Sequence, residues 1–339
     1  MASLTISLCM IVKNEEDLID QCLTSVNDVV DEMIIVDTGS TDRTIDICKK
    51  YNPSIYSYQW QGNFSEARNF GITKASSDWI LILDADEKLE SNSNEVIRKT
   101  IEHTKASILL LPVINYYGEG FPVKEDQAYL YYQPRLFKNH VGIQYSNSIH
   151  ENPQLHGNDT QELITEQIET PIHHYGYIDE IINKKEKSKR NIDILLKEYK
   201  KNKHSPWIEY HLANEFYRQS KFEIAFDYVN ESIFGFLLQG IKPPAILYRL
   251  KYDILVQTNS IDGAYPAIDK AIDLYPDYVD LHYIKGILLF HKKQYSEALA
   301  CFEKCLELGE NHPRYLILKG TGSFRALYFK EKCLKMLNT

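Results

Sequence analysis

Strand-like and helix-like segments alternate through the first 90 residues of the chain. Apolar, β-prone runs at residues 5–12, 33–36 and 55–58, and the later run WILIL, are separated by segments with apolar residues at helical spacing. This β-α-β-α order predicts an α/β fold with a mostly parallel sheet and helices on both faces. Right-handed crossovers then place the carboxyl ends of the strands at one edge, where such sheets bind ligands.

Acidic residues come directly after two of these strands. Asp37 follows the run MIIV, and WILILDADE ends in Asp84, Asp86 and Glu87. Carboxylates this close together at the end of a buried strand repel one another. A divalent cation such as Mg²⁺ or Mn²⁺, shared with diphosphate oxygens, relieves that repulsion. The alternative is an ordinary acidic turn that faces water.

The composition excludes several classes of protein. The chain has 339 residues and a formal net charge of −9, which argues against a nucleic-acid-binding surface. No apolar run reaches the roughly 18 to 20 residues of a membrane span. The N-terminus has neither the basic stretch nor the cleavage site of a signal peptide. We therefore expect a cytoplasmic protein.

The second half of the chain contains a repeat. Ala264 and Ala298 lie 34 residues apart, as do Ala271 and Cys305, and 34 residues is the tetratricopeptide period. About three repeats are expected, followed by a capping helix over residues 315–337.

Three regions are therefore expected. Residues 1–177 form the α/β domain, whose last part is β-prone and aromatic and completes the sheet. Residues 178–205 form one linking helix, expected to be continuous from 178 to 203. Residues 206–339 form an all-α tetratricopeptide-repeat domain.

The ordered motifs CMIVKNEEDLIDQCLTSV, DEMIIVDTGSTDRT, FSEARNFG and WILILDADE resemble the inverting family-2 glycosyltransferases, which have the GT-A fold. The resemblance covers residues 4–90 and continues more weakly through RLFK, IHENP and HHYGY. With the trailing repeats, the arrangement is similar to the peptide S-glycosyltransferases of glycocin biosynthesis. Similar domains occur in bacterial cell-surface glucosyltransferases, so the acceptor does not follow from the fold.

The resemblance implies a role for several residues in holding a UDP-sugar. Asp37 would bind the uracil or ribose, and Glu15 would line the same pocket. Asp84, the first acid of the DxD motif, would face the ribose. Arg68 would lie near the diphosphate or the sugar, because a guanidinium pairs well with phosphate oxygens. Arg135 would brace the diphosphate or the acceptor loop.

The resemblance also implies a metal site. Asp86 would bind Mg²⁺ or Mn²⁺, and His174 would be a further ligand of the metal or the diphosphate. Because adjacent strand residues point to opposite faces, only one of His173 and His174 can face the site. The alternative for a histidine on a strand is a structural role.

Inverting transfer needs a carboxylate that takes a proton from the acceptor. Glu151, in the IHENP loop, is the expected base and Glu87 is the reserve. The alternative for a loop glutamate is simple solvation. A cysteine acceptor, with a pKa of about 8.5, needs less help from a base than a hydroxyl does.

Three functions therefore remain open. The first is a metal-dependent inverting glycosyltransferase that moves glucose or N-acetylglucosamine from UDP to a peptide side chain, Cys or Ser/Thr of a bacteriocin precursor. The second is the same chemistry on a cell-surface polysaccharide or lipopolysaccharide. The third is a non-catalytic tetratricopeptide adaptor. The stacked repeats would offer a peptide a concave surface, or they would form a homodimer.

Overall fold

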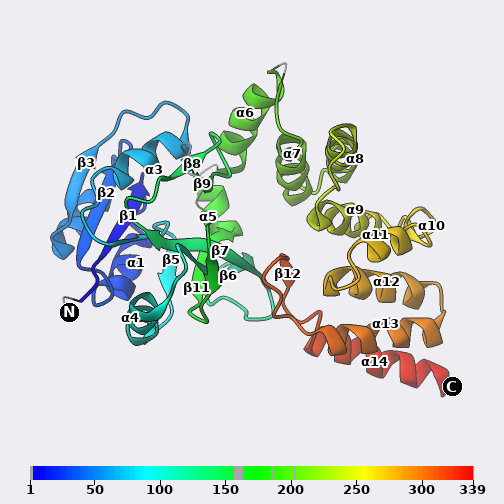
Figure 1. Ribbon diagram of the computed structural model, residues 1–339. Coiled ribbons are helices and arrows are strands. Elements are labelled where there is room, and N and C mark those ends of the chain that lie inside the picture. The colour runs from blue at the N-terminus through cyan, green and yellow to red at the C-terminus, as the bar shows by residue number, and fades with distance from the viewer. Residues whose placement is uncertain (1–2, 156–162, 185–186, 202, 339) are drawn as a thin grey trace. The chain divides into compact units, whose positions relative to one another are not determined.

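The computed structural model describes residues 3–155, 163–184, 187–201 and 203–338 (Figure 1). The chain forms two compact units. The first, the sheet unit, comprises Met1–Glu125 and Tyr131–Lys184. The second, the repeat unit, comprises Asp126–Leu130 and Lys185–Thr339. The repeat unit is therefore assembled from two separate stretches of chain.

The N-terminal part of the sheet unit alternates strands and helices, as the sequence predicts. Its elements are β1 (Ile6–Val12), α1 (Ile19–Val26), β2 (Glu32–Asp37), α2 (Thr44–Cys48), a 3-10 turn (Lys49–Tyr51), β3 (Ser54–Ser57), α3 (Phe64–Ile72), β4 (Trp79–Ile82), β5 (Glu87–Leu89) and α4 (Ser93–His103). The first four strands run parallel in the order β3-β2-β1-β4. The predicted parallel core is confirmed.

The rest of the sheet unit completes a mixed sheet. It contains β6 (Ile108–Gly118), most of β7 (Ala128–Lys138), β8 (Ile143–Ser146), β9 (Asn152–Leu155), β10 (Thr165–Gln167), β11 (Ile172–Ile178) and α5 (Asp179–Lys184). The first three residues of β7 belong to the repeat unit. The strand order is β3-β2-β1-β4-β7-β6-β11-β5, and β10 pairs with β6. β7 is antiparallel to β4, and β5 is antiparallel to β11. β8 and β9 form a separate antiparallel pair.

Alternate residues of the central strands pack on opposite faces of this sheet. Leu8 and Met10 of β1 join the core formed with α1 and α4. Cys9, between them, joins a second core with Ile34 of β2 and the apolar residues of α3. This alternation is the ordinary period of a strand buried on both faces. Both faces are packed, so the ends of the central strands are firmly held.

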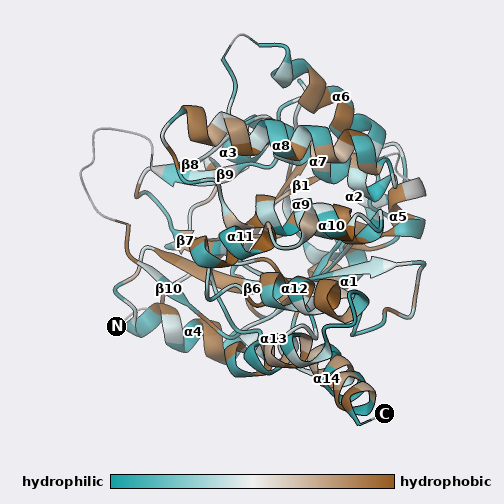
Figure 2. Ribbon diagram, turned by 90° about the vertical axis from the view of Figure 1, so that its right-hand side faces the viewer, coloured by the Kyte–Doolittle hydropathy of each residue, from teal (hydrophilic) through white to brown (hydrophobic). Residues whose placement is uncertain are grey.

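The repeat unit is helical. Its helices are α6 (Lys187–Tyr199), α7 (Trp207–Arg218), α8 (Phe222–Leu238), α9 (Ala245–Gln257), α10 (Ile261–Ala264), α11 (Ile268–Leu274), α12 (Val279–His291), α13 (Tyr295–Leu308) and α14 (Phe324–Leu337). They show both hydrophilic and hydrophobic segments in Figure 2, as amphipathic helices do. The four residues that defined the 34-residue spacing, Ala264, Ala271, Ala298 and Cys305, are all buried. The predicted register of the repeat is therefore correct.

Two details of the repeat unit differ from the prediction. The second helix of the middle repeat is broken into α10 and α11 at Pro266, because proline has no N–H to donate and its ring crowds the preceding turn. The final segment is not helical from residue 315. Ile317–Leu318 forms a short strand, β12, which pairs with Leu130 and Tyr129, and α14 begins only at Phe324.

The expected linking helix, residues 178–205, does not form a separate element. Ile178 ends β11, and α5 belongs to the sheet unit. α6 belongs to the repeat unit and ends at Tyr199 rather than at residue 203.

A hydrogen bond from a buried, ion-paired arginine joins the two stretches of the repeat unit. Arg249 Nε donates to Asp280 Oδ2 at 2.9 Å, and Arg249 Nη2 donates to the Tyr129 hydroxyl at 2.9 Å. Asp280 also accepts from the Leu318 N–H at 3.0 Å and from Thr321 Oγ1 at 2.8 Å. Because both oxygens of Asp280 accept hydrogen bonds and Arg249 donates through two nitrogens, the buried charges are compensated.

Candidate active site

The acidic residues that follow β2 and β4 lie at the same edge of the sheet. Asp37, the last residue of β2, is in register with Val12 of β1. Ile82, the last residue of β4, is in register with Cys9 of the same strand. Because the three strands are parallel, their carboxyl ends coincide. Asp37 and the Asp84–Asp86 turn therefore flank the end of β1.

The loops after β1 and β2 are joined by hydrogen bonds. The Glu15 N–H donates to Thr44 Oγ1 at 2.7 Å, which places Glu15 at the same edge. Asp37 Oδ1 accepts from the Ser40 N–H at 2.9 Å. These bonds fix the turn that carries Asp37, so both predicted nucleotide-binding residues lie on ordered loops.

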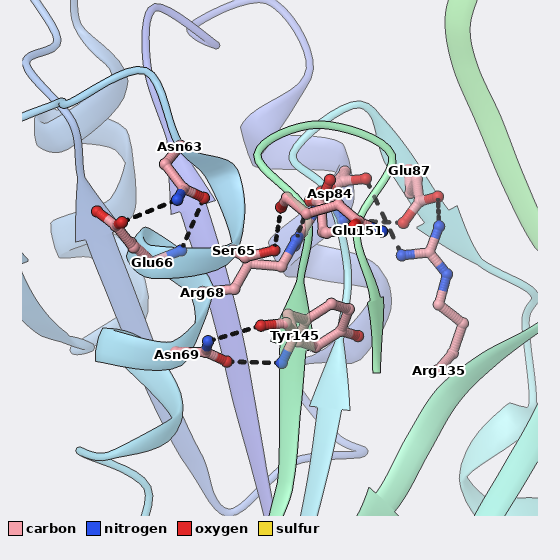
Figure 3. A network of polar contacts seen from close by, with 11 residues as sticks. Asn63, Ser65, Glu66, Arg68, Asn69, Asp84, Glu87, Arg135, Tyr145 and Glu151 are labelled. Carbon is pink, nitrogen blue, oxygen red and sulfur yellow. Dashed lines mark hydrogen bonds and ion pairs between the residues drawn. The ribbon is translucent and has the colours of Figure 1, made fainter. Parts of the chain in front are cut away.

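Arg68 links two carboxylates that are distant in sequence (Figure 3). Its Nη2 donates to Asp84 Oδ1 and its Nε to Glu151 Oε1, each at 2.6 Å. The Arg68 side chain is only 9% exposed. Charge-assisted bonds of this kind are stronger than neutral ones. The predicted diphosphate-binding arginine and the predicted base are therefore direct neighbours.

Arg135 approaches the same carboxylates from β7. Its Nη2 donates to Glu87 Oε1 at 2.6 Å, and its Nη1 lies 3.9 Å from Asp84 Oδ2. Burial alone would raise the pKa of Asp84, but Arg68 and Arg135 outweigh that effect and hold the pKa below its ordinary value. Asp84 is therefore ionised at neutral pH and lies between two guanidinium groups.

The reserve base, Glu87, has a different position from the one expected. Its side chain has no exposed area. Oε1 accepts from Arg135, and Oε2 accepts from the Asp84 N–H at 2.8 Å. A carboxylate with both oxygens occupied inside the protein does not suit proton transfer from an acceptor. Glu87 instead braces the end of β4.

Two arginine atoms of this cluster have no hydrogen-bond acceptor among the described residues. They are Arg68 Nη1 and Arg135 Nε, and both are buried. Buried donors of this kind are costly in free energy unless a ligand or water supplies the acceptor.

His174 faces Asp86, as predicted, and His173 does not. His174 Nε2 lies 3.5 Å from Asp86 Oδ1. Its other nitrogen, Nδ1, is 2.8 Å from Asn115 Oδ1. The Asn115 amide is oriented by its Nδ2, which donates to the Val113 carbonyl at 3.2 Å. An amide oxygen only accepts, so Nδ1–H donates to Asn115 Oδ1 in this contact, and Nε2 is the ring nitrogen on the side of Asp86.

A nitrogen lone pair and a carboxylate that face each other are a fitting pair of ligands for a divalent cation. Among the residues that the structure describes, no group of three or more His, Cys, Asp or Glu side chains could hold a metal ion. Asp86 and His174 would thus supply two ligands, and Mg²⁺ and Mn²⁺ commonly take the others from phosphate and water. His173 contacts Tyr116 and Glu90 instead.

Three residues at this site were not singled out in the sequence analysis. Asn115 orients His174 from the middle of β6. Tyr145 lies beside Arg68, with the guanidinium carbon 5.6 Å from the ring centre, and burial raises its pKa to about 12. Asn69 follows Arg68 and hydrogen-bonds the backbone of Tyr145. Only Asn69 could have been found, because it lies inside the motif FSEARN.

Residues 7–154 match the model of glycosyl transferase family 2, and residues 279–312 match that of the tetratricopeptide repeat. The sheet unit contains a family-2 glycosyltransferase domain. The resemblance seen in the motifs is thereby confirmed, together with the fold class of a mixed α/β domain followed by helical repeats.

Two curated relatives match most of this chain. A TPR repeat-containing protein of Synechococcus elongatus is 30% identical over 278 residues, which is 80% of this chain and 64% of that protein. The SPbeta prophage-derived glycosyltransferase SunS of Bacillus subtilis is 28% identical over 292 residues, which is 84% of this chain and 67% of that protein. The chain thus spans about two thirds of the length of these relatives.

Among solved structures, the crystal structure of S. aureus TarS 1-349 aligns with 77% of this chain and 89% of its own, at 13% identity and a TM-score of 0.39. In the part of the chain that the structure describes, no helix is both long and apolar enough to cross a membrane.

Proposed function

We propose that this protein is an inverting glycosyltransferase that moves a sugar from a UDP-sugar to a peptide side chain, with Cys favoured and Ser or Thr next. The observation that carries the proposal is the pair of buried arginines beside Asp84. Each has a buried N–H that meets no acceptor among the described residues, at the edge of the sheet where Asp37 and Asp86 also lie. A diphosphate supplies the missing acceptors and the negative charge.

In this proposal each residue of the site has a distinct task. Asp37 and Glu15 bind the nucleoside, and Asp84 orients Arg68 and Arg135 toward the diphosphate while facing the ribose. Asp86 and His174 hold Mg²⁺ or Mn²⁺. When bound, the cation offsets the negative charge that develops on the leaving diphosphate.

Glu151 is proposed as the base. It takes the proton from the acceptor thiol or hydroxyl, and the sulfur or oxygen forms a bond with C1 of the sugar. The bond between C1 and the diphosphate oxygen breaks, and its electron pair leaves with UDP. Attack opposite the leaving group inverts the configuration. Arg68 Nε binds Oε1 of Glu151, which fixes the direction of the carboxylate.

The repeat unit is proposed to bind the acceptor peptide, because stacked helix pairs suit an extended chain. A cell-surface glycan acceptor is the main rival. A non-catalytic adaptor is disfavoured because the buried arginines and their carboxylates would then have no function that justifies their cost. A homodimer formed through the repeats is compatible with either acceptor.

The test is UDP-sugar hydrolysis by the full chain with Mn²⁺. Slow release of UDP from UDP-glucose or UDP-N-acetylglucosamine is expected, and Asp86→Ala should abolish it. Asp46→Ala is the matched control, since Asp46 is exposed on α2 and forms an ion pair with Lys49 at 3.0 Å, away from the arginine cluster. If calorimetry detects no binding of either UDP-sugar, the proposed glycosyltransferase function is wrong.

The acceptor is tested separately by mass spectrometry. Peptides that differ only in Cys, Ser or Ala at one position are incubated with the preferred donor. Sugar addition to the Cys peptide supports the favoured acceptor. Addition to an oligosaccharide and to none of the peptides would support the rival.

A further inference from the structure

One face of α3 lies along the chain segment that carries Glu151. Ser65, Arg68 and Asn69 are spaced three and four residues apart, so their side chains project from the same side of the helix. All three contact residues 145–151, which we call the Glu151 segment (Figure 3). The segment runs from the end of β8 to Glu151.

Asn69 binds the first residue of the segment as a neighbouring strand would. Its Nδ2 donates to the Tyr145 carbonyl at 2.9 Å, and its Oδ1 accepts from the Tyr145 N–H at 2.8 Å. Both polar groups of the amide and both backbone groups of Tyr145 are satisfied by this pair. Tyr145 is buried, so removal of the amide would leave two backbone groups without partners away from water.

The contacts continue along the segment toward Glu151. Ser65 Oγ donates to the Asn147 carbonyl. The Phe64 N–H donates to the Ser148 carbonyl at 2.9 Å. Arg68 then binds the Glu151 carboxylate. The helix thus contacts the segment at its beginning, its middle and its end.

α3 itself is firmly placed against the sheet. Ala67 is fully buried, and a Cβ added at Gly71 would lie 3.1 Å from Val36 Cγ2 of β2. A helix packed this closely has little freedom to shift. Its bonds to the Glu151 segment therefore transmit the position of the sheet to Glu151.

We infer that Asn69 and Ser65 are positioning residues for Glu151, and that they act through the backbone of the Glu151 segment. This inference rests on the proposed function, in which Glu151 takes the acceptor proton. α3 then positions the groups that act on both sides of the transferred sugar. Arg68 binds the leaving diphosphate, and the Asn69 and Ser65 bonds position the base, Glu151. The Arg68–Glu151 ion pair alone fixes one oxygen of the carboxylate but not the backbone that carries it.

The test compares Asn69→Ala with Asn139→Ala in the full chain. Asn139 is a matched control because its Nδ2 also binds backbone, at 3.2 Å from the Ala75 carbonyl and 2.9 Å from the Ser77 carbonyl. It lies in the same unit but next to the start of β4, at the edge opposite the site. Both variants lose a half-buried amide that hydrogen-bonds backbone.

Two measurements are made on each variant. Hydrogen exchange of peptides covering residues 144–151 should become at least about 10-fold faster in Asn69→Ala and stay unchanged in Asn139→Ala. With Mn²⁺, kcat for UDP-sugar hydrolysis should fall about 10- to 100-fold in Asn69→Ala, while KM changes less than about 2-fold. Thermal unfolding should shift to a similar extent in both variants.

Each outcome decides the inference. Unchanged exchange in the Glu151 segment, or a similar kcat in both variants, would show that Asn69 supports only stability. Faster exchange together with a kcat loss that Asn139→Ala does not share supports the positioning role. If the wild-type chain binds no UDP-sugar, the proposed function fails first and the positioning role fails with it, whatever the exchange shows.

Discussion

Arg68 and Glu151, 83 positions apart in the sequence, are joined by a 2.6 Å bond between Nε and Oε1. The same guanidinium binds Asp84 through Nη2. Three separate motifs, FSEARN, WILILDAD and IHENP, therefore meet at one side chain. This meeting explains why the motifs occur together in the chain, since each supplies one partner of a single buried cluster.

Arg68→Lys is expected to weaken donor binding although it keeps the charge. An ammonium group carries its three N–H bonds on one nitrogen, so it cannot span the separate positions from which Nε binds Glu151, Nη2 binds Asp84 and Nη1 faces the phosphate. We expect UDP binding in the presence of Mn²⁺ to weaken about 10- to 100-fold, as measured by calorimetry.

The control for this prediction is Arg98→Lys. Arg98 also forks, with 2.7 Å bonds to the carbonyls of Leu4 and Val29, but it lies away from the site. The Arg98→Lys variant should be less stable than the wild type and should bind UDP with the same affinity. Equal UDP affinity in wild type and Arg68→Lys would contradict the role given to Arg68.

Gly286→Ala should destabilise the repeat unit. A Cβ at this position would lie 2.7 Å from two ring carbons of Phe302, and Phe302 is fully buried. α12 and α13 cannot move apart without opening the core. The substitution should therefore lower the free energy of unfolding by about 1–3 kcal/mol. Thermal unfolding of the full chain measures it.

Gly263→Ala is the matched substitution in the same unit. Its Cβ would lie 4.0 Å from Leu255 Cδ2, an ordinary contact. This variant should be neutral or slightly more stable, because alanine is the better helix former. A loss of stability that is the same at both glycines would argue against close packing of α12 on α13.

Glu32 should make stability depend on pH in the acid range. Burial opposes its ionisation, but hydrogen bonds from Ser7 and from Ser76, whose N–H lies 2.9 Å away, outweigh burial and lower its pKa. A lowered pKa in the folded state stabilises the protein above the unfolded pKa of about 4.3, and the gain is lost as the pH falls through the folded pKa.

The comparison is therefore wild type against Glu32→Gln in urea unfolding. The difference in the free energy of unfolding should stay constant from pH 7 to about pH 5 and shrink below about pH 4.3. Glu102→Gln, on the exposed side of α4, controls for the loss of one surface charge. A difference that is the same at pH 7 and pH 3 would show that these bonds do not favour the ionised form.

The part of the site that could be predicted is the part set by local pattern. Asp37, Asp84 and Asp86 follow apolar runs directly, and parallel strands must end at one edge, so their grouping follows from secondary structure alone. The choice of His174 over His173 follows from strand alternation in the same way. The repeat register follows from spacing.

The rest depends on contacts that no local pattern encodes. Glu87 was a reserve base because it follows the DxD motif, yet its carboxylate turns inward because Arg135, 48 positions later, meets it there. In the sequence, Asn115 is an ordinary strand residue. Its contact with His174 forms only in the folded sheet, where β11 lies beside β6. The break at Pro266 has a local cause, a proline inside a helical pattern, which was not considered in the spacing argument.

The buried bond between Arg249 and Tyr129 has a practical consequence for dissecting the chain. A fragment that starts after α5 would contain every repeat helix but would lack residues 126–130. It would leave the edge of β12 unpaired and remove the hydroxyl that the guanidinium needs. No single cleavage of the polypeptide can release this half of the molecule intact, so a failure of isolated repeats to fold would say nothing about the integrity of the repeats themselves.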